Sequence, residues 1–384
     1  MRLRTTLLLA ILGLALSRAP SQATKTYRYA AVPDGDLCLI SADGNTRLVL
    51  SANTADMDWE GIAVSPTGAL IAVQNSAHYR LYEIDPKTGK MRLIHDGGSL
   101  GFNMPDEPTW LTPEVLLLET WDKDGVDAGK YAANIKTGAW RRVVPRQNDE
   151  WTSGSVLVPS PSGKLLATDL DVTAAEWLSV SEVASGRTLW RTNPKEGMEG
   201  FSGMTWSRDN KSLFVSFLID NEMASGSPGG LWKFDALTGK QHLWKYRKRS
   251  VDGVWGSPER GLLAVDVGNR LEFLRMDDGK LLFKLPESNL GSVIEVFFLG
   301  SARILVSGDR GLAEVNASGK AVRTYTLNKG FYDGSVGLKY SASRDAVMYG
   351  RNGVLDLKTG KITKFGRAVS DATNVEWLSK DVVH

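Results

Sequence analysis

Short apolar runs of strand length, separated by turn residues, repeat along almost the whole chain. In one type of hairpin an apolar strand leads through a turn glycine into a second strand, as in LYEIDPKTGKMRLI around Gly89. This hairpin occurs around eight glycines, 40 to 53 residues apart: Gly44, Gly89, Gly138, Gly186, Gly239, Gly279, Gly319 and Gly360. A strand-bearing repeat of this period is typical of a β-propeller blade.

A second hairpin with the same period lies between the glycine hairpins. It reads GIAVSPTGALIAV over 61–73 and GMTWSRDNKSLFVSF over 203–217. Each repeat therefore holds four strands, A and B from this hairpin and C and D from the glycine hairpin. Pro, Gly, Asn and Asp occupy the turns because they preset or tolerate the backbone angles required there. The pattern predicts an all-β propeller of four-stranded antiparallel blades.

The two ends of the chain predict how the ring closes. TYRYAAV (26–32) reads as strand B of the blade whose C–D hairpin surrounds Gly44, and NVEWLS (374–379) reads as a final strand A with a stub at 382–383. A C-terminal strand A that completes the blade begun by the N-terminus would close the ring. We expect eight blades, with seven as the alternative if one terminal hairpin packs outside the ring.

The N-terminus predicts export. Arg2 and Arg4 precede an apolar run over 7–16, and the small residues around Ala23 follow it. This is the pattern of a secretory signal peptide over 1–23, and the run is shorter than the ~20 residues that a membrane span needs. We therefore expect 24–384 to be one propeller domain in the periplasm or secreted, with no membrane insertion.

Charge and cysteine content narrow the function. The chain has 46 basic and 44 acidic residues, and the predicted leader holds three of the arginines, so 43 basic residues remain against 44 acidic ones. A single basic run, 245–249, stands out, and we interpret it as a solvated loop. Nucleic acid is not an expected partner, since phosphate binding needs a concentrated positive surface. Cys38 is the only cysteine, which excludes an internal disulfide and a multi-cysteine metal site.

The A–B turns SPTG (65–68), SPSG (160–163) and SRDN (207–210) resemble the repeats of WD40-like and TolB-type periplasmic propellers. The resemblance implies an exported propeller and names no substrate.

The long D–A and B–C connections are expected on one face of the ring, where function usually lies on a rigid scaffold. Trp59, Trp121 and Trp151 fall in these loops, and we predict them to be exposed anchors for a ligand or partner, together with Glu107 and Glu150. Four other tryptophans fall on strand A, where we expect them to fill contacts between blades: Trp110, Trp206, Trp255 and Trp377.

An acidic residue recurs just before strand A, which lines the central channel. The residues are Glu60, Glu107, Glu150, Glu199, Asp252, Asp333 and Asp371. Converging carboxylates attract a cation or raise one another's pKa. The alternative, which we slightly favour, is that each carboxylate accepts hydrogen bonds within its own blade. The first interpretation assigns Ca²⁺ or another divalent cation to Glu60, Glu199, Asp252 and Asp333.

Three further segments resemble known motifs. WEGIAVSPTG (59–68) is similar to the entry strand of propeller lactonases and phytase-like esterases, which implies Glu60 as a metal ligand. Asp122, Asp124 and Asp127 resemble part of a calcium loop, with an exposed polar loop as the alternative. SEVASGRTLW (181–190) resembles the quinoprotein dehydrogenase repeat, whose tryptophan docks adjacent blades, but its spacing recurs nowhere else in the chain.

Familiar catalytic signatures are missing, since the sequence has neither a GxSxG elbow nor an HExxH motif and its four histidines are scattered. Our leading hypothesis is an exported, non-enzymatic propeller that binds a protein or a small cationic ligand on its acidic loop face. One alternative is a metal-dependent hydrolase that uses the channel-mouth carboxylates. Another is a propeller subunit of a periplasmic complex.

Overall fold

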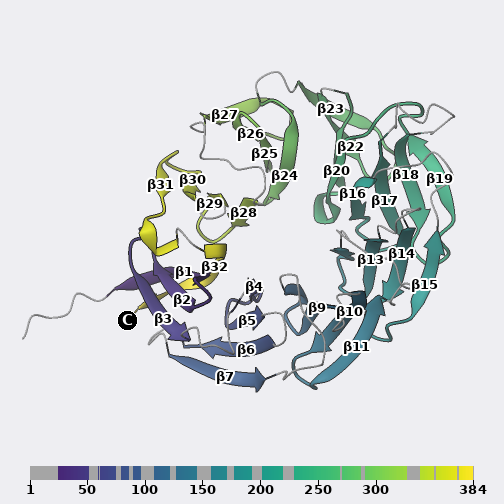
Figure 1. Ribbon diagram of the computed structural model, residues 1–384. Coiled ribbons are helices and arrows are strands. Elements are labelled where there is room, and N and C mark those ends of the chain that lie inside the picture. The colour runs from purple at the N-terminus through teal and green to yellow at the C-terminus, as the bar shows by residue number, and fades with distance from the viewer. Residues whose placement is uncertain are drawn as a thin grey trace, which may run out of the picture.

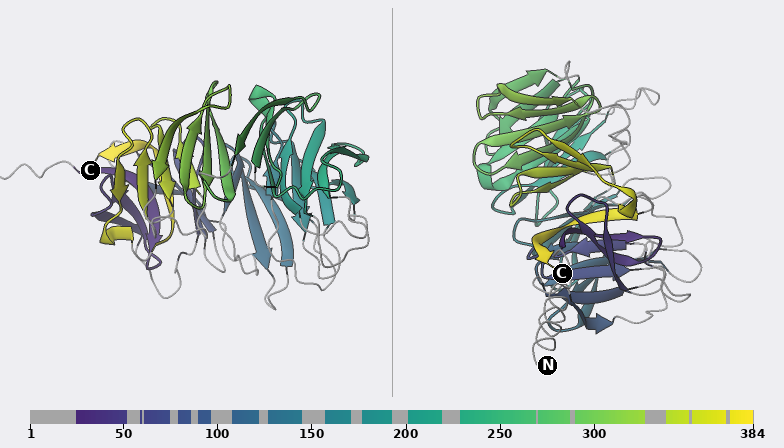
Figure 2. Two further views of the ribbon diagram at one scale, coloured as in Figure 1. Left: turned by 90° about the horizontal axis from the view of Figure 1, so that it is seen from above. Right: turned by 90° about the vertical axis from the view of Figure 1, so that its left-hand side faces the viewer.

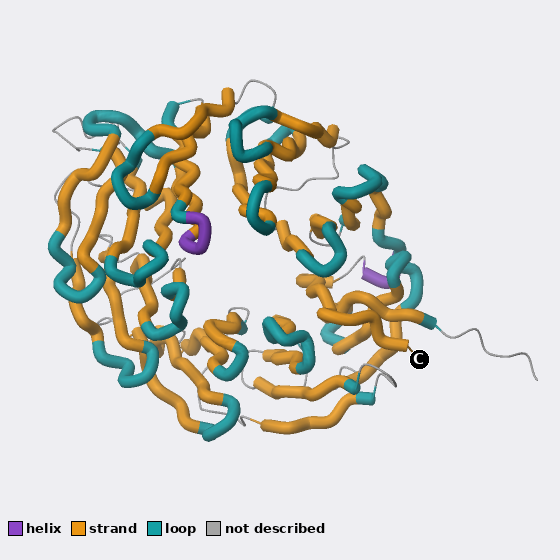
Figure 3. The backbone as a smooth tube through the Cα atoms, turned by 180° about the vertical axis from the view of Figure 1, so that it is seen from behind, coloured by secondary structure: helices purple, strands orange, loops and turns teal. Residues whose placement is uncertain are grey.

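The computed structural model describes residues 25–51, 59, 61–74, 79–85, 90–96, 108–121, 127–144, 157–170, 177–192, 201–218, 229–268, 270–286, 290–326, 338–349, 352–369 and 372–383. These residues form eight four-stranded antiparallel sheets arranged in a ring (Figure 1). Besides strands, they include two short 3-10 helices, η1 (Pro258–Arg260) and η3 (Arg367–Val369) (Figure 3). The predicted β-propeller with eight blades is confirmed.

Each blade runs from an inner strand A to an outer strand D. The first blade has β32 (Ala372–Val383), β1 (Thr26–Pro33), β2 (Leu37–Ser41) and β3 (Arg47–Ser51). The second has β4 (Gly61–Val64), β5 (Leu70–Gln74), β6 (Tyr79–Ile84) and β7 (Met91–Asp96). The third has β8 (Thr109–Thr112), β9 (Val115–Trp121), β10 (Asp127–Asn134) and β11 (Ala139–Val144). The fourth has β12 (Leu157–Pro159), β13 (Leu165–Leu170), β14 (Trp177–Glu182) and β15 (Thr188–Thr192).

The second half of the ring repeats this order. The fifth blade has β16 (Phe201–Trp206), β17 (Ser212–Phe217), β18 (Gly230–Asp235) and β19 (Gln241–Lys245). The sixth has β20 (Gly253–Ser257), β21 (Leu262–Asp266), β22 (Arg270–Arg275) and β23 (Leu281–Pro286). The seventh has β24 (Val293–Leu299), β25 (Arg303–Gly308), β26 (Gly311–Val315) and β27 (Ala321–Thr326). The eighth has β28 (Leu338–Ser341), β29 (Ala346–Tyr349), β30 (Gly353–Asp356) and β31 (Ile362–Lys364).

The ends of the chain close the ring as predicted. β32 pairs antiparallel with β1, with Ala30 opposite Glu376, so that the C-terminal strand is strand A of the first blade (Figure 1). It runs unbroken to Val383, where we expected a short strand and a stub. The Arg28 guanidinium donates to the Asp381 carboxylate at 2.8 and 3.1 Å, and Arg344 of the eighth blade contacts the same carboxylate at 2.7 Å.

The core lies between neighbouring blades, and indole groups tie their inner strands together. Trp206 is 1% exposed and donates its Nε1–H to the Val158 carbonyl of the preceding blade at 2.8 Å. Trp110 donates likewise to Ala63 at 3.2 Å and Trp377 to Lys339 at 3.1 Å. Each acceptor lies two residues before the serine that begins the A–B turn. These three tryptophans, and Trp255, which is packed among residues of the sixth and seventh blades, fill blade contacts as expected.

An aromatic ring on the outer strand of a blade covers the turn glycine of the next blade. A Cβ at Gly239 would lie 2.8 Å from the Trp190 ring, and Trp190 also donates its Nε1–H to the Ala236 carbonyl at 2.8 Å. Trp244 covers Gly279, Phe283 covers Gly319 and Phe365 covers Gly44 in the same way. Tyr325 lies beside Gly360, with a closest approach of 3.8 Å.

This contact corrects one conclusion from the sequence. In the sequence, the docking tryptophan of SEVASGRTLW has no tryptophan counterpart at the same distance from the turn glycine of another blade. The structure shows that Trp, Phe or Tyr fills the same place, four to six residues after the turn glycine of its own blade.

The structure predicts a measurable difference between two glycine substitutions. Gly239 and Gly138 both have φ of +69°, but a Cβ at Gly138 would meet no atom within 4 Å. Both Gly→Ala changes strain the backbone, and only Gly239→Ala also forces a methyl group into the Trp190 ring. We expect Gly239→Ala to lower the free energy of unfolding by about 1–3 kcal/mol more than Gly138→Ala does. Urea unfolding of the two variants measures this, and equal losses would contradict the docking role.

The ion pairs at the closure predict a pH dependence. Burial raises the pKa of Asp381, but the Arg28 and Arg344 guanidinium groups outweigh it and lower that pKa overall. A lowered carboxyl pKa stabilises the fold above the unfolded value of about 3.9, and the stabilisation is lost as the pH falls toward the folded value. We expect Asp381→Asn to cost about 1–3 kcal/mol at pH 7 and progressively less as the pH falls below about 4.

The matched control for this prediction is Glu83→Gln. Glu83 accepts from Arg92 at 2.6 Å, but both side chains are exposed and belong to one blade. Such a surface pair contributes little to stability. A pH-independent loss for Asp381→Asn, measured by urea unfolding across this range, would show that charge is not what holds the closure.

Candidate functional site

The connections divide the ring into two faces. The short A–B and C–D turns lie at one face, and the B–C and D–A connections lie at the other (Figure 2). We call them the turn face and the loop face. No helix in the described part of the chain is long and apolar enough to cross a membrane.

Most of the predicted loop-face site lies outside the described residues. This is true of Glu60, Glu107, Asp122, Asp124, Glu150, Trp151, Glu199, Asp333 and Asp371. Trp121 and Asp127 are described as paired positions where β9 and β10 meet the loop face. The roles assigned to all these residues stay predictions.

Trp59 is not the exposed anchor that we expected. Its indole is 2% exposed and belongs to the apolar cluster between the first and second blades, with Leu39 and Ile62. The Arg80 guanidinium lies 5.7 Å from the ring centroid. A large apolar ring gains more free energy from filling a blade contact than from facing water. The exposed position predicted for Trp59 is therefore wrong.

Asp252 is the one member of the acidic series that the structure describes. It is exposed, and its carboxylate accepts a hydrogen bond from Ser250 Oγ at 3.0 Å. Its backbone N–H donates to the Asp266 carbonyl at 3.0 Å. Among the described residues, no group of three or more His, Cys, Asp or Glu side chains is placed to hold a metal ion. At Asp252, the described contacts are those of a locally bonded carboxylate.

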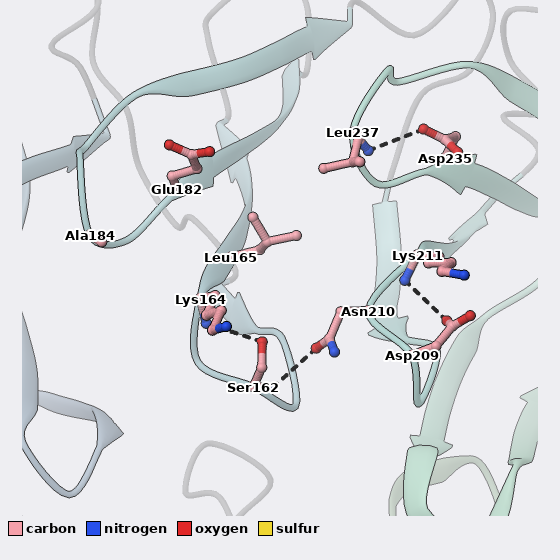
Figure 4. Close-up of a pocket in the computed structure, with 10 residues that line it drawn as sticks. All are labelled: Ser162, Lys164, Leu165, Glu182, Ala184, Asp209, Asn210, Lys211, Asp235 and Leu237. Carbon is pink, nitrogen blue, oxygen red and sulfur yellow. Dashed lines mark hydrogen bonds between the residues drawn. The ribbon is translucent and has the colours of Figure 1, made fainter.

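A pocket of about 720 Å³ lies on the turn face between the fourth and fifth blades (Figure 4). Its walls are the A–B and C–D turns of both blades, and its lining includes Lys164, Leu165, Glu182, Asp209, Lys211 and Leu237. The Ser162 N–H of the fourth blade donates to Asn210 Oδ1 of the fifth at 3.1 Å, which ties the two A–B turns together. We take this pocket as the candidate site.

The middle of the pocket is apolar. Leu165 of the fourth blade, 9% exposed, and Leu237 of the fifth approach it from opposite sides (Figure 4). Leu237 is 67% exposed, more than any other large apolar side chain in the described part of the chain. The Asp235 carboxylate accepts from the N–H groups of Leu237 at 3.1 Å and Thr238 at 2.8 Å. This turn holds Leu237 outward.

The acidic groups at the rim are already bonded to their own turns. Glu182 accepts from Ser185 Oγ at 2.7 Å and from Arg187 at 2.8 Å, and the Arg187 hydrogen bond lowers its pKa. Asp209 accepts from Ser207 Oγ at 2.7 Å, which lowers its pKa. Both carboxylates therefore stay ionised, and Arg187 balances the charge of Glu182, whereas the hydrogen bonds to Asp209 come from neutral groups.

The basic groups at the rim differ from the acidic ones. Lys164 and Lys211 are exposed, and neither forms an ion pair within the described part of the chain. The pocket thus combines an apolar centre with two ammonium groups that are exposed at its rim. An amphipathic group fits this arrangement if its negative charge lies beside the lysines and away from the carboxylates of Glu182, Asp209 and Asp235.

The sequence carries a signal for this pocket that the strand pattern alone does not reveal. The position two residues before the turn glycine is small or polar in the other C–D hairpins, as at Lys136, Ala184, Asp277 and Lys358. It is Leu237 in the fifth blade alone. Alignment of the eight repeats at this position singles out Leu237, whereas the search for long loops and acidic residues passes over it.

The architecture defines the class of protein, an eight-bladed β-propeller, and the first of two comparisons with solved structures agrees with it. The chain is similar to a solved structure of the dihydro-heme d1 dehydrogenase NirN in complex with DHE, with a TM-score of 0.54 and 10% identity over 93% of this chain and 74% of that one. It is also similar to BamB from Moraxella catarrhalis, with a TM-score of 0.48 and 12% identity over 83% of this chain and 86% of that one. No protein-family model and no curated protein matches the sequence. At these identities the likeness shows the fold alone.

Proposed function

We propose that this protein is an exported, non-enzymatic propeller that binds a segment of a partner protein in the turn-face pocket. The observation that carries the proposal is the position of Leu237. Its side chain is 67% exposed and lines the pocket, and Leu165 of the neighbouring blade lines the same pocket. Single exposed apolar side chains are common, but Leu237 stands in a pocket beside a second leucine, where a partner can bury the apolar area of both. Export follows from the predicted leader over 1–23, which lies outside the described residues.

The pocket has the size and anatomy of a protein-binding site. Its volume of about 720 Å³ accommodates one large side chain with its flanking backbone. An apolar centre with a polar rim is the usual arrangement around the residues that dominate binding energy. Lys164 and Lys211 would meet a carboxylate beside the inserted side chain. The expected segment therefore has an aliphatic or aromatic residue next to Asp or Glu.

This proposal moves the binding site predicted from the sequence to the other face. Long loops favour the loop face as a functional surface, but the described pocket is built from short turns held between blades. A role as a subunit of a larger complex agrees with the proposal, because the partner is a protein. Cation binding and metal-dependent hydrolysis depend on loop-face carboxylates that, apart from Asp252 and Asp127, lie outside the described residues, and both stay predictions.

The test is selection of a displayed random-peptide library on residues 24–384, with counter-selection on Leu237→Asp. We expect peptides with an apolar residue beside Asp or Glu. Burying a leucine contributes about 1.5–3 kcal/mol, so Leu237→Asp should weaken binding at least about tenfold in fluorescence polarisation. Lys164→Gln with Lys211→Gln should weaken the same peptides, but not versions in which their acidic residue is changed to Asn or Gln.

The control variant is Leu282→Asp. Leu282 is a 45% exposed leucine on β23, outside the pocket, and its substitution should leave binding unchanged. Recovery of peptides that bind wild type and Leu237→Asp equally would overturn the proposed site. So would a selection that yields no sequence preference.

A further inference from the structure

The basic run over 245–249 forms a fixed turn. The Arg249 N–H donates to the Tyr246 carbonyl at 3.0 Å and closes the turn. Tyr246 and Lys248 have φ of +62° and +59°, although neither is glycine. Non-glycine residues rarely adopt this left-handed conformation, and they keep it only where the surrounding structure enforces it. The expectation of a merely solvated loop is therefore incomplete.

A buried carboxylate on the next blade holds the turn. Tyr246 Oη–H donates to Glu272 Oε2 at 2.6 Å, and Glu272, on β22, is 4% exposed. Arg270 and Lys284 approach the other oxygen of Glu272 at 2.8 and 3.2 Å. Burial raises the pKa of Tyr246, so its hydroxyl stays protonated as a donor. For Glu272 burial acts in the same direction, but the hydrogen bonds from Tyr246 and Lys284 lower the pKa overall.

These contacts gather positive charge at one place. Arg247, Lys248 and Arg249 are exposed, and the side chains of Arg270 and Lys284 are 38% and 46% exposed. We call these five residues the basic patch. Its internal carboxylate, Glu272, is buried, accepts a hydrogen bond from Tyr246 and forms ion pairs with Arg270 and Lys284. The chain without its predicted leader has 43 basic and 44 acidic residues, so the patch is a local feature and not a reflection of overall charge.

We infer that the basic patch docks the protein on an anionic membrane surface. Arg247, Lys248 and Arg249 are consecutive and all exposed, and none of the pocket-lining residues belongs to this turn, so its charges face solvent at the surface. On a flat surface each of them can meet a separate headgroup phosphate, and each such Lys or Arg adds to the attraction. Because the turn is held in place before binding, little further ordering is needed.

The position of the patch agrees with this role. The turn follows β19 and belongs to a D–A connection, so it lies at the loop face. The pocket between the fourth and fifth blades lies on the turn face, and none of its lining residues belongs to the patch. Contact with a membrane through the patch therefore leaves the pocket accessible. The inference does not depend on the proposed function.

The experiment is co-sedimentation of residues 24–384, which contain every described strand, with vesicles. One set is phosphatidylcholine mixed with an equal amount of phosphatidylglycerol, and the other is phosphatidylcholine alone. We expect binding to the anionic vesicles only, weakened at least about tenfold in the triple variant Arg247→Gln, Lys248→Gln, Arg249→Gln. The control triple variant Lys358→Gln, Lys361→Gln, Lys364→Gln removes the same charge from exposed positions on the eighth blade and should bind like wild type.

A second variant separates the geometry of the patch from its charge. Tyr246→Phe removes the hydrogen bond to Glu272 and keeps every basic side chain, and we expect it to weaken vesicle binding severalfold. Equal losses in the two triple variants would overturn the inference in favour of net charge. Unchanged binding of Tyr246→Phe would overturn the role of the fixed turn. Binding to polyglutamate or inorganic phosphate without binding to anionic vesicles would assign the patch to an acidic segment or a small anion instead.

Discussion

The docking of each blade on its neighbours is the constraint on which the architecture depends, and at five junctions of the described chain an outer aromatic ring packs beside the turn glycine of the next blade. A single four-stranded sheet cannot bury both of its faces, so every blade needs neighbours on both sides. At the periphery Trp190, Trp244 and Phe283 cover the turn glycines of the following blades, and nearer the axis indole N–H groups donate to backbone carbonyls of the preceding blades. Phe365 on Gly44 brings the last blade against the first, where β32 pairs with β1.

The same contact builds the candidate site. Trp190 both covers Gly239 and donates to the Ala236 carbonyl, so it seats the turn that carries Leu237. The Asp235 carboxylate then holds that turn from within its own blade. The pocket therefore forms where two docked blades bring their turns together. A leucine at position 237, where the other blades have a small or polar residue, makes its centre apolar. A rigid frame of this kind lowers the entropy lost when a partner binds.

The two faces of the fifth blade differ in the chemistry they offer. Toward the turn face, Leu237 and the two lysines at the pocket rim suit an apolar segment with a negative neighbour. Toward the loop face, Tyr246 bonds across to Glu272 and presents Arg247 and Lys248 on a strained turn. In both places a carboxylate that accepts hydrogen bonds holds a turn in a conformation that exposes a side chain. A protein partner and a membrane surface could thus engage opposite sides of one blade.

The sequence by itself determined the repeat and the four strands of each blade, and it favoured eight blades over seven; the pairing of β32 with β1 in the tertiary structure decided for eight. The repeat and the strands follow from local patterns, since the alternation of apolar runs and the turn glycines act within a few residues. Only the tertiary structure decided that Trp59 is buried, that Phe and Tyr replace Trp as docking rings, and that Leu237 meets Leu165 in a pocket. The hydrogen bond from Tyr246 to Glu272 was likewise decided by the tertiary structure alone. Each of these depends on which residues two different blades bring together, and the pattern within any one short segment does not specify that.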